Sequence, residues 1–152
     1  MQTTPYINFQ GKCREAMQFY RDLLHGEITQ MFRYGESPMA SEMPEESHDG
    51  IMHSELVAAG AVIMGADGPP QEGKGANNVS IALTLDDVDE AERIFAGLAE
   101  GGEVGMEMQK TFWAERFGMC VDRYGIAWLV NGGLAAELPS GSAAGAESEA
   151  TA

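Results

Sequence analysis

The sequence has few basic residues, few cysteines and no long apolar run. Its 152 residues include 9 lysines and arginines against 24 aspartates and glutamates, which gives a formal net charge of −15. Nucleic acids and anionic lipid surfaces are bound by basic patches, so this charge argues against both as partners. No apolar stretch approaches the roughly 20 residues of a membrane-spanning helix, which argues against a membrane protein. A neutral or cationic ligand is compatible with the acidity, as is solubility alone.

The two cysteines, Cys13 and Cys120, do not form the spaced set of a disulfide-stabilised secreted domain. The first residues, MQTTPYINFQ, lack the basic and apolar regions of a signal peptide. These two observations predict a cytoplasmic protein with reduced thiols.

An internal repeat organises the chain. Residues 15–26 read EAMQFYRDLLHG and residues 90–101 read EAERIFAGLAEG, at an offset of 75 throughout. In both segments apolar residues recur every three or four positions, which predicts two amphipathic helices. Each segment ends at a glycine, a residue common just after a helix, and Asp86 and Asp87 precede the second helix as candidate N-caps.

Strand-like segments flank each predicted helix in the same order: one before it, one after it, and a closing hairpin. They are 6–9, 27–34, 52–58 and 61–66 in the first half, and 79–85, 103–111, 117–121 and 126–131 in the second. The pattern predicts an α+β domain over residues 1–134, with two βαβββ halves at about 1–67 and 77–134. A helix covers one face of such a sheet, so the other apolar faces must meet or curve into a cupped mixed sheet.

Three segments depart from the repeat. Residues 35–50 hold prolines and a run of carboxylates, and residues 65–78 read GADGPPQEGKGANN. Loops of this length in a compact domain are usually functional lids or disordered segments, and both interpretations stay open. Residues 135–152 are almost all small or acidic, so we expect a disordered tail.

A tandem βαβββ pattern is the architecture of the vicinal-oxygen-chelate superfamily, which includes glyoxalase I, extradiol dioxygenases and bleomycin-resistance proteins. The local sequence resembles the PhnB family of that superfamily through PYINFQGKCREAMQFY, HSEL, VIMGAD and TFWAERFGMCVDRYGIAWLVN. The resemblance runs from about Pro5 to Asn131. It implies the glyoxalase/bleomycin-resistance fold and a homodimer, but a fold alone does not imply an activity.

The resemblance also implies where a metal would sit. Superfamily enzymes usually hold a divalent metal with four side chains, and those positions fall near Pro5, Met64, Ser80 and Trp128. None of these is a plausible ligand for zinc, nickel or iron, so no cofactor is predicted and a divalent metal would need other ligands. The PhnB family has also been described as similar to 3-demethylubiquinone methyltransferase. Nothing in the sequence matches the glycine-rich first turn of a doubly wound methyl-donor domain.

His53 and Glu55 are the candidates for catalysis. They are two residues apart on a predicted strand, so alternation places them on one face, together with Ile51 and Val57. A histidine beside a carboxylate is suited to acid/base chemistry. A polar pair on the outer face of the sheet would give the same pattern.

Four further candidates concern ligand binding, three of them along the cup. Met64, Ser80 and Trp128 are predicted to line it, as an apolar site for an organic molecule or as an ordinary dry core. Asp67 follows Met64 at the end of its strand.

A dense group of large side chains, Phe112, Trp113 and Arg116, precedes the last hairpin. Such residues suit a pocket mouth or a subunit contact, although simple strand packing explains them equally well. Arg116 is also a candidate for binding an anion such as a phosphonate, which the acidity of the chain disfavours.

Two functions remain open. The first is a homodimer that binds a small hydrophobic or cationic molecule in an apolar cup without the usual metal site. The alternative is a metal-dependent or acid/base lyase, isomerase or dioxygenase that uses His53 and Glu55, with Asp67 as a further candidate.

Overall fold

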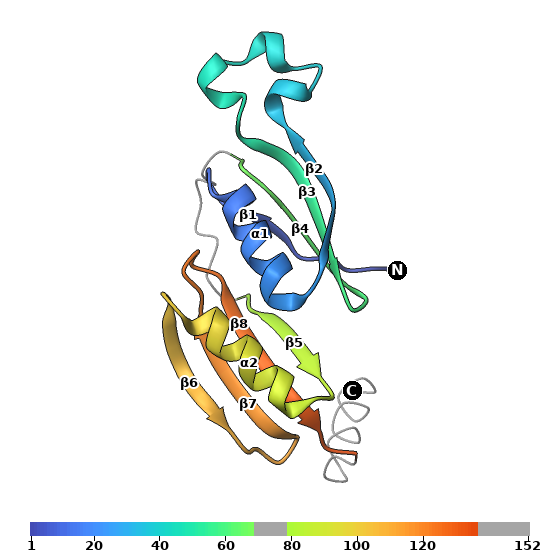
Figure 1. Ribbon diagram of the computed structural model, residues 1–152, viewed down its shortest axis with the longest axis vertical. Coiled ribbons are helices and arrows are strands. Elements are labelled where there is room, and N and C mark those ends of the chain that lie inside the picture. The colour runs from blue at the N-terminus through green and yellow to red at the C-terminus, as the bar shows by residue number, and fades with distance from the viewer. Residues whose placement is uncertain (69–78, 137–152) are drawn as a thin grey trace, which may run out of the picture. The chain divides into compact units, whose positions relative to one another are not determined.

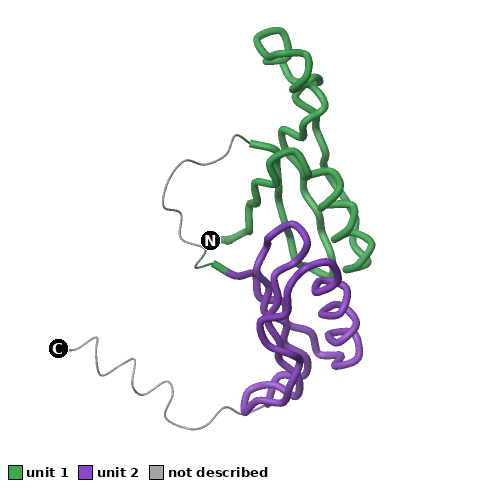
Figure 2. The backbone as a smooth tube through the Cα atoms, turned by 90° about the vertical axis from the view of Figure 1, so that its left-hand side faces the viewer, with its two compact units in different colours: residues 1–79 green, residues 80–152 purple. Residues whose placement is uncertain are grey.

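The structure, a computed structural model, describes residues 1–68 and 79–136. The chain folds into two compact units, Met1–Val79 and Ser80–Ala152, which Figure 2 colours separately. Each unit has its own four-stranded sheet and its own helix. The α+β class with two βαβββ halves is therefore confirmed.

The first unit runs β1 (Tyr6–Asn8), α1 (Cys13–Leu24), β2 (Glu27–Arg33), β3 (Ile51–Ala58) and β4 (Ala61–Ala66). Its sheet has the order β1-β4-β3-β2, with β1 parallel to β4 and the other pairs antiparallel. Between β2 and β3 the chain forms three short 3₁₀ turns, which project beyond the ends of these strands (Figure 1). We call residues 34–50 the arm.

The second unit repeats this order with β5 (Ile81–Leu85), α2 (Val88–Ala99), β6 (Glu103–Gln109), β7 (Ala114–Val121) and β8 (Ala127–Leu134). Its sheet has the order β5-β8-β7-β6, and β5 is parallel to β8. Only residues 110–113 join β6 to β7, so the second unit has no counterpart of the arm.

Each helix packs one face onto its own sheet. The buried residues recur at helical spacing, Cys13, Ala16, Met17 and Tyr20 in α1 and Ala91, Ile94, Phe95 and Leu98 in α2. Burying a large side chain of this kind contributes about 1.5–3 kcal/mol, so these two stripes hold the helices in place. The amphipathic helices predicted from the repeat are confirmed.

The two helices begin differently. Asp87 is the N-cap of α2, and its carboxylate accepts a hydrogen bond from the Glu90 N–H at 3.1 Å. Lys12 is the N-cap of α1 and provides no side-chain cap. At the other end of α1, His25 takes the left-handed conformation at φ 53°, although the sequence favoured Gly26. Gly26 serves a different purpose, because a Cβ there would lie 2.8 Å from the Val57 carbonyl oxygen.

The strands of the last hairpin are longer than predicted. Ala114 pairs with Leu134, and the Ala135 N–H donates to the Trp113 carbonyl oxygen at 2.8 Å, so the ladder continues past the expected end at residue 131. Most of the predicted tail, 137–152, lies outside the described residues, as does 69–78 of the predicted 65–78 loop. No helix in the described part of the chain is long and apolar enough to cross a membrane.

Candidate functional site

The first sheet has one face against α1 and one face without a helix. Ser54 marks the covered face, because its hydroxyl lies 3.3 Å from the Cys13 thiol of α1. His53 and Glu55 alternate with it and therefore lie on the opposite face. The register places Tyr6 beside Met64, and Met64 beside Glu55, in one row across three strands.

Aromatic groups gather on that opposite face. The rings of Tyr6 and His53 stack with their centroids 6.0 Å apart, and Phe32 pairs with His53 across β2 and β3. Tyr6 is 57% exposed and Phe32 is 47% exposed. We call the residues Tyr6, Phe32, His53, Glu55 and Met64 the helix-free face.

The predicted acid/base pair lies on this face without direct contact. Within the described residues, no hydrogen bond or ion pair joins His53 to Glu55. The Thr29 hydroxyl instead donates to Glu55 Oε1 at 2.7 Å, which orients that carboxylate. Burial raises the pKa of the Tyr6 phenol, helped by Tyr34 and Cys13, so Tyr6 keeps its proton at neutral pH.

Ile51 does not share the face of His53, contrary to the expected alternation. It is 1% exposed and belongs to the core with Ser54 and Leu56. The register between β2 and β3 shifts between Phe32 and Arg33, so the regular alternation does not extend to the start of β3.

Asp67 holds three segments of the first unit together. Its Oδ1 accepts the N–H groups of Gly11 at 2.7 Å and Cys13 at 2.9 Å, and its Oδ2 accepts the N–H of Ile51 at 2.9 Å. Cys13 is the first residue of α1, so Asp67 places a carboxylate where Lys12 offers no cap. Both oxygens are thereby engaged by the backbone, a role that no local sequence pattern indicates.

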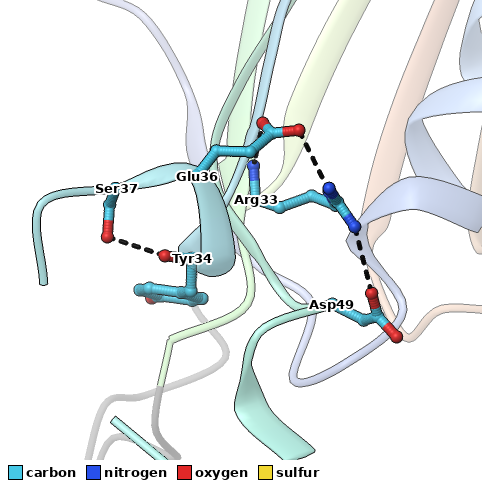
Figure 3. Close-up of polar contacts among 5 residues, drawn as sticks. All are labelled: Arg33, Tyr34, Glu36, Ser37 and Asp49. Carbon is cyan, nitrogen blue, oxygen red and sulfur yellow. Dashed lines mark hydrogen bonds and ion pairs between the residues drawn. The ribbon is translucent and has the colours of Figure 1, made fainter. Parts of the chain in front are cut away.

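Arg33 forms ion pairs with residues at both ends of the arm. Its Nε donates to Glu36 Oε1 at 3.1 Å, and one terminal nitrogen donates to Asp49 Oδ1 at 3.3 Å (Figure 3). The backbone N–H and the guanidinium of Arg33 lower the pKa of the Glu36 carboxyl. Arg33 thus links the start of the arm to its end.

In the second unit, Trp128 lies on the covered face rather than facing a ligand. It is 1% exposed, and its indole N–H donates to Asp122 Oδ2 at 2.8 Å. Gly132, four residues further along β8, faces α2, because a Cβ there would lie 2.7 Å from Ala91 Cβ. The orientation expected for Trp128 is therefore wrong, because its side chain lies on the face of β8 that α2 covers.

The cluster before the last hairpin is divided between two faces. Trp113 contacts the rings of Phe112 and Phe117 at 4.8 and 5.1 Å, and its indole N–H donates to Asn131 Oδ1 at 3.1 Å. Arg116 instead reaches Glu92 of α2 at 2.9 Å. The structure brings the aromatic rings together and separates Arg116 from them. Ser80 is exposed just before β5.

No group of three or more histidine, cysteine, aspartate or glutamate side chains in the described ranges is arranged to hold a metal. At the positions that the family resemblance assigns to metal ligands, Met64 offers a thioether and Trp128 an indole N–H that is already donated to Asp122. These groups do not fit a divalent metal.

Comparisons with known proteins agree with this fold. The family model described as 3-demethylubiquinone-9 3-methyltransferase matches residues 1–131. Protein YjdN of Escherichia coli K12 is 30% identical over 139 residues, which are 86% of this chain and 95% of YjdN. The crystal structure of protein PA1353 from Pseudomonas aeruginosa is 43% identical, with a TM-score of 0.77 over 87% of this chain and 97% of that one.

A PhnB protein from Bacillus cereus, described as a putative 3-demethylubiquinone-9 3-methyltransferase, is 25% identical with a TM-score of 0.72 over 87% of this chain and 99% of that one. The name of the family does not establish an activity for this chain, whose described sheets are two separate mixed ones rather than one doubly wound parallel sheet. The resemblance to the PhnB family noted from the sequence is confirmed: the chain belongs to the 3-demethylubiquinone-9 3-methyltransferase family of PhnB-like proteins.

Proposed function

We propose that the chain binds a small, flat organic molecule against the helix-free face of the first sheet. The observation that supports this is the stack of Tyr6 on His53 at 6.0 Å, beside the exposed ring of Phe32. Exposed aromatic rings in one strip form a surface on which a planar apolar ligand can stack. Met64 adds an adaptable thioether to the same row of the sheet.

The charge of the face favours a neutral or cationic ligand over an anion. Glu55 is the acidic group on this face, and its carboxylate is oriented by Thr29. Arg116, the candidate for binding an anion, is in the second unit and engaged by Glu92. A phosphonate would therefore find no lysine or arginine among the residues of the helix-free face.

Methyl NMR of protein carrying [¹³C-methyl]methionine tests this proposal. With 2-naphthol as the probe, the Met64 methyl signal is expected to move. The signal of Met17, a buried residue of α1, should stay in place. Tyr6→Leu should weaken binding about three- to tenfold, because it removes one stacking ring. Phe112→Leu, which removes a 69% exposed ring of the second unit, is the matched control. An equal loss in both variants, or no movement of Met64, would refute the proposal.

Acid/base catalysis is the second candidate, supported by the Thr29 hydroxyl that orients Glu55 on the face of His53. His53→Ala and Glu55→Gln should each abolish any lyase or isomerase activity found for the purified protein, while Thr29→Val should reduce it less. Unchanged activity in His53→Ala would remove the pair from the mechanism. Since the residues at the family's ligand positions do not fit a divalent metal, no metal-dependent step is proposed.

The homodimer implied by the family resemblance is part of the same proposal. Large apolar side chains left exposed in the second unit, such as Val104 at 39% and Val121 at 38%, are suited to contact with a second copy. Light scattering during gel filtration should give twice the chain mass of 16.3 kDa. A monomer at micromolar concentration would refute this part.

A further inference from the structure

A pocket of about 750 Å³ lies in the first unit between the arm and the start of α1, and none of its lining residues belongs to the helix-free face. This volume is within the range of small-molecule sites. We call it the arm pocket. Its lining includes Tyr34, Met39, Met43, Glu46, Asp49 and Asp67.

One part of the lining is apolar and aromatic. The Tyr34 hydroxyl donates to the Asp67 carbonyl oxygen at 3.0 Å, so the ring is anchored at its tip. The ring edge also packs against Gly50, where a Cβ would lie 3.3 Å from Tyr34 Cδ2. Met39 and Met43 come from the turns of the arm and supply flexible thioethers beside this fixed ring.

The charged part of the lining is entirely acidic. It consists of Glu46, Asp49 and Asp67, without a lysine or arginine among the lining residues. Asp49 forms an ion pair with Arg33, and the oxygens of Asp67 accept backbone N–H groups. Glu46 has no hydrogen bond or ion pair to any residue that the structure describes.

We propose that the arm pocket binds an organic cation, namely a protonated or quaternary amine that carries an apolar group. An aromatic face attracts such a cation, and the thioethers can pack against its apolar group. The carboxylate of Glu46 adds attraction between opposite charges. An anion would meet the three carboxylates. A bare metal ion would find Asp67 already engaged by the backbone and Asp49 engaged by Arg33.

Methionine methyl NMR tests this proposal in the full chain, because Met39 and Met43 line the arm pocket and Met64 lies on the helix-free face. Benzyltrimethylammonium is the probe, with benzyl alcohol as its uncharged counterpart and benzoate as its anionic one. The signals of Met39 and Met43 should move with the cation, less with the alcohol and not with benzoate. Raising the salt concentration should weaken the binding of the cation.

Glu46→Gln should weaken binding of the cation about two- to fivefold. Glu45→Gln is the control, because it removes the same charge from the same turn but from a residue outside the lining. Equal losses in both variants would show a general field effect and overturn the proposal. Equal shifts with the alcohol and the cation would also overturn it.

The two proposed sites have separate readouts. Movement of Met64 alone with benzyltrimethylammonium would place the cation on the helix-free face and refute the arm pocket. Movement of Met39 and Met43 without any response of Met64 to 2-naphthol would support the arm pocket and refute the function proposed above.

Discussion

The two units share one topology but differ in the hydrogen bonds that a single aspartate makes in each. In the second unit, the turn between β7 and β8 is organised by Asp122, which is 3% exposed and lies on the same chain segment as the groups that it binds. In the first unit, Asp67 binds backbone groups that lie up to 56 positions away in the sequence. The same fold is therefore stabilised by local contacts in one half and by contacts between distant segments in the other.

The arm is the second difference. Residues 34–50 separate β2 from β3, whereas residues 110–113 suffice between β6 and β7. The arm lines a pocket of about 750 Å³ in the first unit, whereas the short connection lines one of about 380 Å³ in the second. Loops that depart from a repeat are where function is commonly located.

The largest expected loss of stability comes from replacing Asp122, which forms the local contacts of the second unit. Asp122→Ala removes the acceptor of the Tyr124 and Ile126 N–H groups and of the buried indole N–H of Trp128. We expect the free energy of unfolding to fall by about 3 kcal/mol, measured by urea denaturation. A loss below 1 kcal/mol would show that the turn forms without its aspartate.

Asp67→Ala tests the contacts between distant segments in the first unit. It frees the N–H groups of Gly11, Cys13 and Ile51, but water can reach them more easily because Asp67 is only half-buried. We expect a loss of about 2 kcal/mol. Hydrogen exchange should show that protection falls at the start of α1 and of β3 and not in the second unit. Uniform loss of protection in both units would contradict this separation.

Much of this organisation follows from the sequence. The offset of 75 between the helices predicts the two halves, because apolar residues at helical spacing need one sheet each to cover them. Asp122 is recognisable as well, since a turn residue at this spacing before a glycine and a tryptophan is a local signal. Asp67 is not recognisable, because its partners are set by tertiary contacts.

The facing of Trp128 and Ile51 could not be read from alternation. Alternation fixes which residues share a face only within a regular strand, and it does not say which face a helix covers. The close approach of Gly132 to Ala91 decides that question on β8, and a register shift decides it at the start of β3. The candidate site depends on these facings, so it was less predictable than the fold.

The two buried thiols provide a further comparison of the units, because, besides burial, Asp67 helps to raise the pKa of Cys13 and Asp122 that of Cys120. Burial raises the pKa of Cys13 and of Cys120 to about 11, from a usual value near 9. Because the folded state holds these protons more tightly, their contribution to stability is complete below pH 9 and is lost as the pH rises towards 11. We expect the unfolding free energy to fall by on the order of 1 kcal/mol for each thiol by pH 10.

Cys120→Ala and Cys13→Ala should each reduce this alkaline loss by a similar amount, although each also removes some packing. The slope of the unfolding free energy against pH between 8 and 10 separates the two effects, since lost packing changes the level and not the slope. Both thiols should also stay unmodified by iodoacetamide at pH 7.5 in the native protein. A slope that is unchanged in both variants would assign the alkaline loss to other groups.

The smallest expected effect sharpens the comparison of the two helix starts. Asp87→Ala removes the hydrogen bond from the Glu90 N–H at the exposed N-cap of α2. We expect a loss of about 0.5–1 kcal/mol, because the freed N–H turns to water. Asp87→Asn, which keeps a capping oxygen, should recover most of it, whereas Asp86→Ala should change little. Since Asp67 both caps α1 and joins three segments, its removal must cost more than that of Asp87. An equal loss would mean that the two distant segments gain nothing from Asp67 beyond an ordinary helix cap.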